Sequence, residues 1–317
     1  MKIKIGKLLY NLFRLSRPRQ WIKNLAIFAA ITFSGQLFSS SFIYVSLGFV
    51  AFCFLSSSMY IINDFFDIEK DKLHPFKKFR PLAHNDVSAP ISFILAVIFA
   101  VISIVISWSI TPAFFISVVV YIILQVSYSL VLKQIAIMDI LAIAAGYILR
   151  VYAGEFASGF HISVWLLLTA IAFSLFIAVG KRRSELTLVS NYSDSTILQI
   201  RKSLSHYSER LLDVYASIFA TSTFISYALF TFLENPHGIK VSFNLFMPDF
   251  LPVFFQRKWL MITILPVVYG LMRYLQDIYE KQQGESPEKV LISDTPLLVT
   301  VCIWMISVIF VIYVIGA

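Results

Sequence analysis

The chain has 317 residues, of which 58% are hydrophobic and 14% are charged, and its formal net charge is +8. A soluble chain carries about a quarter charged residues, so this composition excludes an ordinary soluble enzyme and indicates a polytopic membrane protein. Membrane topology and anionic lipid headgroups explain the positive charge, and we expect no nucleic acid partner. Cys53 and Cys302 lie in apolar segments without metal-ligand spacing, so both are expected to be reduced and structural.

The first 20 residues predict a helix at the membrane surface. Leucine and phenylalanine side chains within residues 8–15 form one apolar side, which lysines and Arg14 flank. This pattern is typical of an interfacial amphipathic helix, and Pro18 is expected to end it. The segment is basic and lacks a continuous apolar core, so we expect no cleavable signal peptide.

Nine apolar segments follow, and each is near the ~20 residues that cross the hydrocarbon core. They are residues 24–40, 42–62, 91–109, 112–132, 138–156, 162–180, 211–233, 259–279 and 295–316. Ser34, Gly35 and Gln36 dilute the first of these segments. The pattern predicts an all-α fold of about nine transmembrane helices, in a single domain that covers residues 1–317.

The distribution of basic residues predicts the orientation in the membrane. If the N-terminus is cytoplasmic, 21 of the 26 lysines and arginines lie on the cytoplasmic side and three lie outside. Such a bias follows the positive-inside rule. The long or highly charged segments 63–90, 181–210 and 280–294 then face the cytosol, so we expect the active site to open there.

A cluster of carboxylates follows the second apolar segment. Asp64, Asp67 and Asp71 are spaced i, i+3, i+7, which places them on one face of a continuous helix. Three carboxylates at a membrane boundary repel one another and are costly to desolvate. A Mg²⁺ ion bound by these oxygens and by Asn63 would remove that cost and could hold a phosphorylated substrate. The alternative is a solvated acidic turn outside the bilayer.

Cations come directly after the carboxylates. Lys77, Lys78 and Arg80 lie in a loop that Pro75 and Pro81 restrict. A diphosphate needs this combination, because Mg²⁺ bridges some of its oxygens while lysine and arginine pair with the others. The alternative is a basic loop that touches lipid phosphates, and for Lys78 alone we favour that alternative.

Two further groups lie on the same side of the membrane. Tyr128, Lys133 and Asp139 flank the turn between the fourth and fifth apolar segments. Lys133 could instead be an orientation anchor, and Asp139 could simply favour a helix N-terminus. The run Gly180 to Leu186, GKRRSEL, contains Lys181, Arg182 and Glu185 and is a candidate phosphate cradle. Its alternative role is to anchor the end of a membrane span.

Lys23, Asn24 and Arg150 complete the set of candidate binding residues. Lys23 and Asn24 are at the mouth of the first segment, where they could reach a substrate phosphate or simply begin a helix. Arg150 lies deep in the fifth segment and should face the bundle interior or a water-filled cavity. We expect it to have an acidic partner, and Glu155 is too far along the helix for a close pair.

Together these motifs resemble the UbiA-type superfamily of intramembrane transferases, and within it the decaprenyl-phosphate phosphoribosyltransferase branch. The matching stretches are SRPRQWIKN (16–24), NDFFDIEKDKLHPFKKFRPLA (63–83), YSLVLKQIAIMD (128–139), GYILRVYAG (146–154), GKRRSEL (180–186) and RYLQDIYEKQQGESPEKVLISD (273–294). The resemblance implies nine helices around a central cavity, with an NDxxDxxxD motif on the second. Thr295 departs from the pattern, since family members often have a basic residue between Asp294 and the following proline.

The resemblance implies Mg-dependent transfer of 5-phosphoribose from phosphoribosyl diphosphate to a polyprenyl phosphate, as in prokaryotic cell envelope biosynthesis. Lys77 and Arg80 would contact the donor beside the metal. Tyr128 or Asp139 would bind the ribose hydroxyls. The 5-phosphate and the lipid phosphate would be held by Lys133, Lys181 and Arg182, whose roles the sequence does not divide. The expected location is the plasma membrane, with contacts to membrane lipids, and a homo-oligomer is compatible with the sequence.

The GKRRSEL run separates this branch from its relatives. Aromatic prenyltransferases of the superfamily usually carry a second Asp-rich motif after the sixth helix, whereas here only Glu185 is acidic. A basic cradle fits a donor or an acceptor with an extra phosphate. The alternatives are a UbiA-type prenyltransferase that acts on an aromatic or lipid acceptor, and a transporter or lipid-binding protein that uses the same cavity.

Overall fold

The computed structural model describes residues 2–73, 77–189, 202–234, 259–281 and 287–315, and these residues form helices and no strand. The elements are α1 (Lys2–Leu15), η1 (Pro18–Phe28), α2 (Ala29–Phe33), α3 (Ser41–Phe66), α4 (Ile68–Leu73), η2 (Lys77–Phe79), α5 (Ala89–Trp108), α6 (Pro112–Leu130), η3 (Leu132–Gln134), α7 (Met138–Ser158), α8 (Val164–Val189), η4 (Lys202–His206), α10 (Glu209–Leu233), η6 (Trp259–Thr263), α12 (Ile264–Lys281), α13 (Pro287–Ser293), α14 (Thr295–Phe310) and η7 (Val311–Ile315).

Eight helices in the described part of the chain are long and apolar enough to cross a membrane. They are α3, α5, α6, α7, α8, α10, η6 with α12, and α14 with η7. Their bounds follow the predicted apolar segments closely, so the prediction of an all-α, multi-pass membrane protein is confirmed. The prediction of a single domain stays a prediction.

The first predicted segment, 24–40, is built differently from the other eight. It begins in the 3₁₀ helix η1, continues in the short helix α2, and turns at Gly35, whose φ of 74° is left-handed. Ile27 and Ile31 on this run are fully buried. The Tyr313 hydroxyl accepts a hydrogen bond from Leu37 N at 3.0 Å and donates to Thr32 O at 2.8 Å. The run is therefore held by protein contacts and does not form one long helix.

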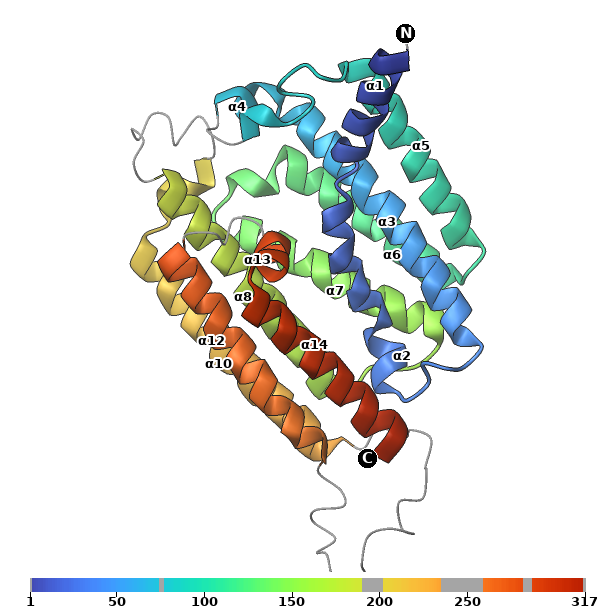
Figure 1. Ribbon diagram of the computed structural model, residues 1–317, viewed down its shortest axis with the longest axis vertical. Coiled ribbons are helices and arrows are strands. Elements are labelled where there is room, and N and C mark those ends of the chain that lie inside the picture. The colour runs from blue at the N-terminus through green and yellow to red at the C-terminus, as the bar shows by residue number, and fades with distance from the viewer. Residues whose placement is uncertain (1, 74–76, 190–201, 235–258, 282–286, 316–317) are drawn as a thin grey trace, which may run out of the picture.

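The long helices are arranged in two groups. In Figure 1, α3, α5 and α6 stand together on one side, and α8, α10, α12 and α14 stand on the other, with η1 and α7 between them. Phe52 of α3 connects the first group, because its ring centroid is 5.8 Å from that of Phe114 and 5.4 Å from that of Tyr121, both on α6. The short helix α4 lies at one end of the molecule and the end of α14 at the other.

The contact between η1 and α7 requires a glycine. A methyl group at Gly154 of α7 would lie 1.9 Å from the carbonyl oxygen of Ile27, a backbone atom that cannot rotate away. We expect Gly154→Ala to lower the free energy of unfolding by about 3 kcal/mol. The thermal midpoint in detergent measures this loss. Gly270→Ala is the control, because its methyl group would meet no atom nearer than 4.0 Å. Equal midpoints for both variants would contradict the prediction.

The N-terminal helix leads directly to the acidic motif. α1 leaves Leu9, Tyr10 and Phe13 exposed, as an interfacial helix requires. The chain then turns at Arg17, whose φ of 51° and ψ of 59° are left-handed, and Pro18 starts η1. This turn places the Arg17 side chain over the end of α3, where the carboxylates lie.

Candidate active site

The acidic motif lies at a break between two helices. α3 ends at Phe66 and α4 begins at Ile68, so Asp67 caps one helix and precedes the next, with φ −102° and ψ 8°. The prediction of one continuous helix through Asp71 is therefore wrong. The carboxylates are neutralised by cations from three different elements, and one straight helical face would not meet all three.

Asp64 and Asp71 share a guanidinium group. Arg80 Nη1 lies 3.0 Å from Asp64 Oδ1 and 2.6 Å from Asp71 Oδ2. Arg17 Nη2 approaches Asp64 from another direction, at 2.5 Å from Oδ1 and 2.7 Å from Oδ2. Both carboxylates are buried, and burial raises the pKa of Asp71 although Arg80 opposes the shift. The two carboxylates therefore face one position, which a positive charge occupies.

Asp67 faces the turn between α6 and α7. Lys133 Nζ lies 2.7 Å from both carboxylate oxygens of Asp67. Ser129 Oγ donates to Asn63 Oδ1 at 3.1 Å. Burial lowers the pKa of Lys133, and the charge of Asp67 opposes that shift. The structure thus brings Asn63, Asp67 and Lys133 together, although their two motifs lie far apart in the sequence.

The donor chemistry of the acidic motif fits Mg²⁺. Three carboxylates and the Asn63 amide supply only oxygen ligands, which this ion prefers. Within the described residues, no three His, Cys, Asp or Glu side chains are gathered closely enough to hold a metal. The reason is that Arg80 lies between Asp64 and Asp71 and Lys133 pairs with Asp67. The residues therefore fit the ion provided that Arg80 and Lys133 turn away from these carboxylates.

Arg182 is the centre of a second ion-pair network. Its Nε lies 2.7 Å from Asp139 Oδ2, its Nη1 pairs with Glu185, and its Nη2 donates to Tyr128 Oη at 3.0 Å. Lys77 Nζ lies 2.9 Å from the other Glu185 oxygen. Arg182 was predicted to hold a phosphate, but its side chain is 0% exposed. In this arrangement its guanidinium group contacts the Asp139, Glu185 and Tyr128 side chains.

Lys181 and Lys23 lie beside this network. Lys181 is half-buried, and in the described part of the chain it makes no hydrogen bond or ion pair. Its electrostatic neighbours include Lys23, Tyr128 and Glu185. Lys23 Nζ lies 3.5 Å from the Tyr60 hydroxyl and 6.0 Å from the ring centroid of Tyr147. These two lysines therefore add positive charge beside Tyr128.

The prediction of an acidic partner for Arg150 is wrong. Arg150 Nε donates to Asn24 Oδ1 at 2.7 Å, Nη1 to Gly146 O at 2.6 Å, and Nη2 to Tyr121 Oη at 2.7 Å. Its guanidinium carbon also lies 4.9 Å from the centroid of the Tyr121 ring. Neutral oxygens and an aromatic face satisfy this buried cation, and no acidic side chain among the described residues pairs with it. Arg150 and Asn24, both predicted to bind substrate, bind each other.

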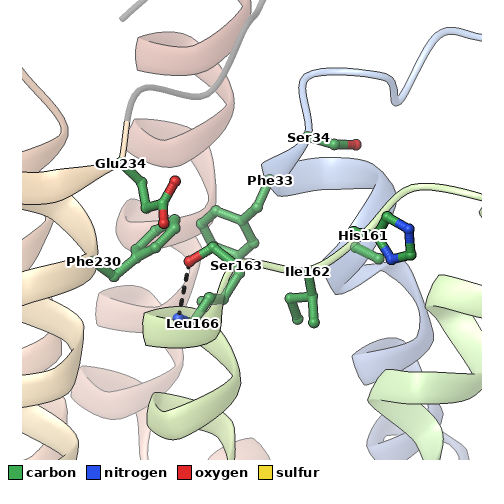
Figure 2. Close-up of a pocket in the computed structure, with 9 residues that line it drawn as sticks. Phe33, Ser34, His161, Ile162, Ser163, Leu166, Phe230 and Glu234 are labelled. Atoms are coloured by element: carbon green, nitrogen blue, oxygen red, sulfur yellow. Dashed lines mark hydrogen bonds between the residues drawn. The ribbon is translucent and has the colours of Figure 1, made fainter.

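A separate cavity lies at the N-terminal end of α8, away from Arg182. It has a volume of about 200 Å³, and both apolar and polar side chains line it. Figure 2 shows Phe33, Ser34, His161, Ile162, Ser163, Leu166, Phe230 and Glu234 around it. Arg182 is 18 residues beyond the first residue of α8, or about 27 Å along the helix axis. None of the predicted site residues lines this cavity.

The structure adds residues that the sequence did not single out. Arg17 was noted only within a motif, and it neutralises Asp64. Ser203 and Tyr207 carried no recognisable signal. The Ser203 hydroxyl lies 3.1 Å from Asp139 Oδ2, and the Tyr207 hydroxyl donates to Asp139 Oδ1 at 2.7 Å. Serine and tyrosine are common in membrane helices and loops, so only the fold reveals this contact.

Comparison with known sequences gives consistent matches. Residues 25–192 match the model of the UbiA prenyltransferase family. A protein of Mycolicibacterium smegmatis named decaprenyl-phosphate phosphoribosyltransferase is 35% identical over 94% of this chain and 91% of its own length. A protein of the same name from Mycobacterium tuberculosis is 30% identical over 96% of this chain and 94% of its own length.

Solved structures share the fold. A UbiA homologue from Archaeoglobus fulgidus bound to DMAPP and Mg²⁺ has a TM-score of 0.68 and 19% identity, over 94% of this chain and 99% of that one. A digeranylgeranylglyceryl phosphate synthase has a TM-score of 0.62 and 16% identity, over 95% and 99%. At these identities the likeness concerns the fold alone.

Proposed function

Because the chain belongs to the UbiA prenyltransferase family, we propose that it transfers 5-phosphoribose from phosphoribosyl diphosphate to a polyprenyl phosphate. Diphosphate is the second product. Full-length relatives named decaprenyl-phosphate phosphoribosyltransferase support this assignment. The observation that carries it at residue level is the second charged cluster, in which Glu185 is occupied by Arg182 and Lys77. This cluster presents cations around a single carboxylate of the α8 run, whereas the acidic motif presents three carboxylates.

The charge balance of the site favours a substrate with several phosphates. Each carboxylate of the two networks is paired with a basic side chain. The pairs are Asp64 with Arg17 and Arg80, Asp71 with Arg80, Asp67 with Lys133, Asp139 with Arg182, and Glu185 with Lys77 and Arg182. These charges cancel, and Lys181 and Arg150 then leave an excess of positive charge. An anionic substrate compensates that excess.

The acidic motif binds the leaving group in this proposal. Asn63, Asp64, Asp67 and Asp71 would hold Mg²⁺, and the ion would supply positive charge against the leaving diphosphate. Arg80 turns from the carboxylates to the diphosphate, because a guanidinium group binds phosphate oxygens as well as it binds carboxylate oxygens. Lys77 exchanges Glu185 for the donor in the same way. The protein groups that neutralise the carboxylates thus become the groups that bind the substrate.

The transfer breaks the bond between ribose C1 and the diphosphate oxygen, and it forms a bond between C1 and an oxygen of the lipid phosphate. The attacking oxygen is already anionic near neutral pH, so the site needs no strong base. Positioning and charge stabilisation account for catalysis. The half-buried Tyr128 binds a ribose hydroxyl, while Lys181 and Lys133 hold the 5-phosphate and the lipid phosphate. The transition state resembles an oxocarbenium ion.

The apolar helices place the reaction in the membrane. The protein is an integral, multi-pass membrane protein. We place the acidic motif and the N-terminus on the cytosolic side of a prokaryotic plasma membrane, because 21 of the 26 basic residues then lie on that side. Phosphoribosyl diphosphate reaches the site from the cytosol, and the polyprenyl tail stays among the helices.

The test is the product formed by purified protein in detergent. We expect labelled phosphoribosyl diphosphate, a polyprenyl phosphate and Mg²⁺ to give a labelled lipid and one diphosphate per transfer, and the mass of the lipid identifies the acceptor. Prenylation of an aromatic acid from a prenyl diphosphate, without any labelled lipid, would assign the chain to the prenyltransferase alternative. Lipid binding without release of diphosphate would instead indicate a transporter or lipid-binding protein.

A further inference from the structure

A short segment after the last matched residue of the family model reaches into the Arg182 network. It contains η4 and Tyr207, and it lies beyond residue 192, where the family match ends. The Tyr207 ring is buried in one apolar cluster with Ile140 of α7, Val179 of α8 and Leu212 of α10. The segment therefore joins three helices at the level of Arg182.

The Tyr207 hydroxyl holds the start of α7. It accepts a hydrogen bond from Ile137 N at 2.6 Å and donates one to Asp139 Oδ1 at 2.7 Å. Burial, with the hydrogen bond to Asp139, raises the pKa of Tyr207, so the hydroxyl keeps the proton that it donates. Ile137 has φ 70° and ψ −47°, a costly backbone conformation for a β-branched residue. Such a conformation persists only where neighbouring contacts fix it.

Ser203 holds the same turn from a second point. Its hydroxyl lies 3.0 Å from Lys133 O and 3.1 Å from Asp139 Oδ2, and the side chain is fully buried. Both oxygens of Asp139 are thus bound, one to Tyr207 and the other to Ser203 and Arg182. This matters because Asp139 and Arg182 are both 0% exposed, and a buried ion pair is stable only when its remaining hydrogen bonds are satisfied.

We infer that Ser203 and Tyr207 are positioning residues of the transfer site. Through Asp139 and Arg182 they fix the positions of the Tyr128 and Lys77 side chains. Through the turn before α7 they fix the position of the Lys133 backbone. Neither residue is placed against substrate. The inference rests on the proposed function, because the side chains that it positions are the ones proposed to bind phosphoribosyl diphosphate and the lipid phosphate.

Tyr207→Phe tests this inference, because it removes one hydroxyl and keeps the buried ring. We expect the KM for phosphoribosyl diphosphate to rise about tenfold, the size of a lost hydrogen bond to a charged group, with kcat within about threefold of wild type. Tyr279→Phe is the matched control. The Tyr279 hydroxyl donates to Asp213 at 2.8 Å, and Asp213 lies 2.8 Å from Arg183 Nε, so the same three groups recur one residue along α8 on an exposed face. Its KM and kcat should equal those of wild type.

A double-mutant cycle separates positioning from stability. Because Tyr207 acts through Asp139, Tyr207→Phe should change KM less than twofold when Asp139→Asn is already present. A purely structural role predicts a lower Tm with an unchanged KM for the folded fraction, and that result would overturn the inference. If Tyr207→Phe does not fold, Ser203→Ala makes the same test from the other contact to Asp139.

The inference can also fail independently of the proposed function. If wild-type protein makes no labelled lipid, the proposed function fails. The affinity for inorganic diphosphate with Mg²⁺, measured by calorimetry without turnover, then decides the inference. Weaker binding by Tyr207→Phe than by wild type supports it. Equal affinity, or a failure of both proteins to bind the probe, overturns it.

Discussion

Replacing Asp64 with asparagine is expected to lower kcat/KM for phosphoribosyl transfer by about 10³-fold, the size that follows when one preorganised group at a charged centre is lost. Asp64 is 2% exposed, and it binds Arg17 and Arg80. Asparagine keeps the shape of the side chain but removes its charge and turns one oxygen into a donor. The variant therefore loses a proposed metal ligand and faces two guanidinium groups that it cannot neutralise.

The kinetics of Asp64→Asn should also change with the metal. We expect the Mg²⁺ concentration at half-maximal rate to rise, and chelation by EDTA to abolish the wild-type rate reversibly. Glu69→Gln is the matched control, because Glu69 lies on α4 beside the same motif but is 83% exposed and pairs only with Lys72 on the surface. Folded Asp64→Asn protein with a rate within tenfold of wild type would remove Asp64 from the proposed metal site.

The membrane helices were predictable because the bilayer imposes their length. An apolar stretch that ends in charged residues has one stable arrangement in lipid, so hydropathy alone gave α5, α7 and α10 nearly to the residue. The run from η1 to α2 was not predictable in detail. Ile27 and Ile31 are buried by other protein elements and not by lipid, so its shape depends on contacts with α3 and α7 that lie far away in the sequence.

The members of the candidate site were predictable, but their pairing was not. Local sequence shows a charged residue at a membrane boundary, and such a residue is costly without a partner. The partner itself depends on the fold, since Arg17 lies 47 residues from Asp64 and Lys77 lies 108 residues from Glu185. Arg150 shows the same limit, because an amide, a hydroxyl and an aromatic ring replace the carboxylate expected beside it.

The basic run of α8 serves three different surfaces. Successive residues of a helix point about 100° apart, so three consecutive cations cannot form one cradle. Arg182 points inward to Asp139, whereas Arg183 points outward to Asp213 and Glu209. Lys181 is the cation of the run that we propose to bind substrate. The sequence grouped Lys181 with Arg182 as phosphate-binding candidates, whereas the helix gives the two side chains different surroundings.

Lys181→Met is therefore expected to lower kcat/KM by about 100-fold, which is the loss of a charge-assisted hydrogen bond to a phosphate. Methionine keeps the length of the side chain and removes the ammonium group. Lys78→Met is the control, because Lys78 is exposed and lies over the Phe79 ring, 5.2 Å from its centroid. It should retain wild-type kinetics, since its charge faces solvent.

Lys181→Met is expected to lower activity without lowering stability. A half-buried ammonium that makes no ion pair in the described part of the chain is desolvated without compensation, so removing its charge should leave Tm equal or raise it. Reduced activity at undiminished stability is typical of a group kept for substrate. If the KM for phosphoribosyl diphosphate rises in Lys181→Met, Lys181 binds the 5-phosphate of the donor. If the KM for the polyprenyl phosphate rises, Lys181 binds the lipid phosphate. A lower Tm with unchanged kcat/KM would show instead that Lys181 stabilises the fold.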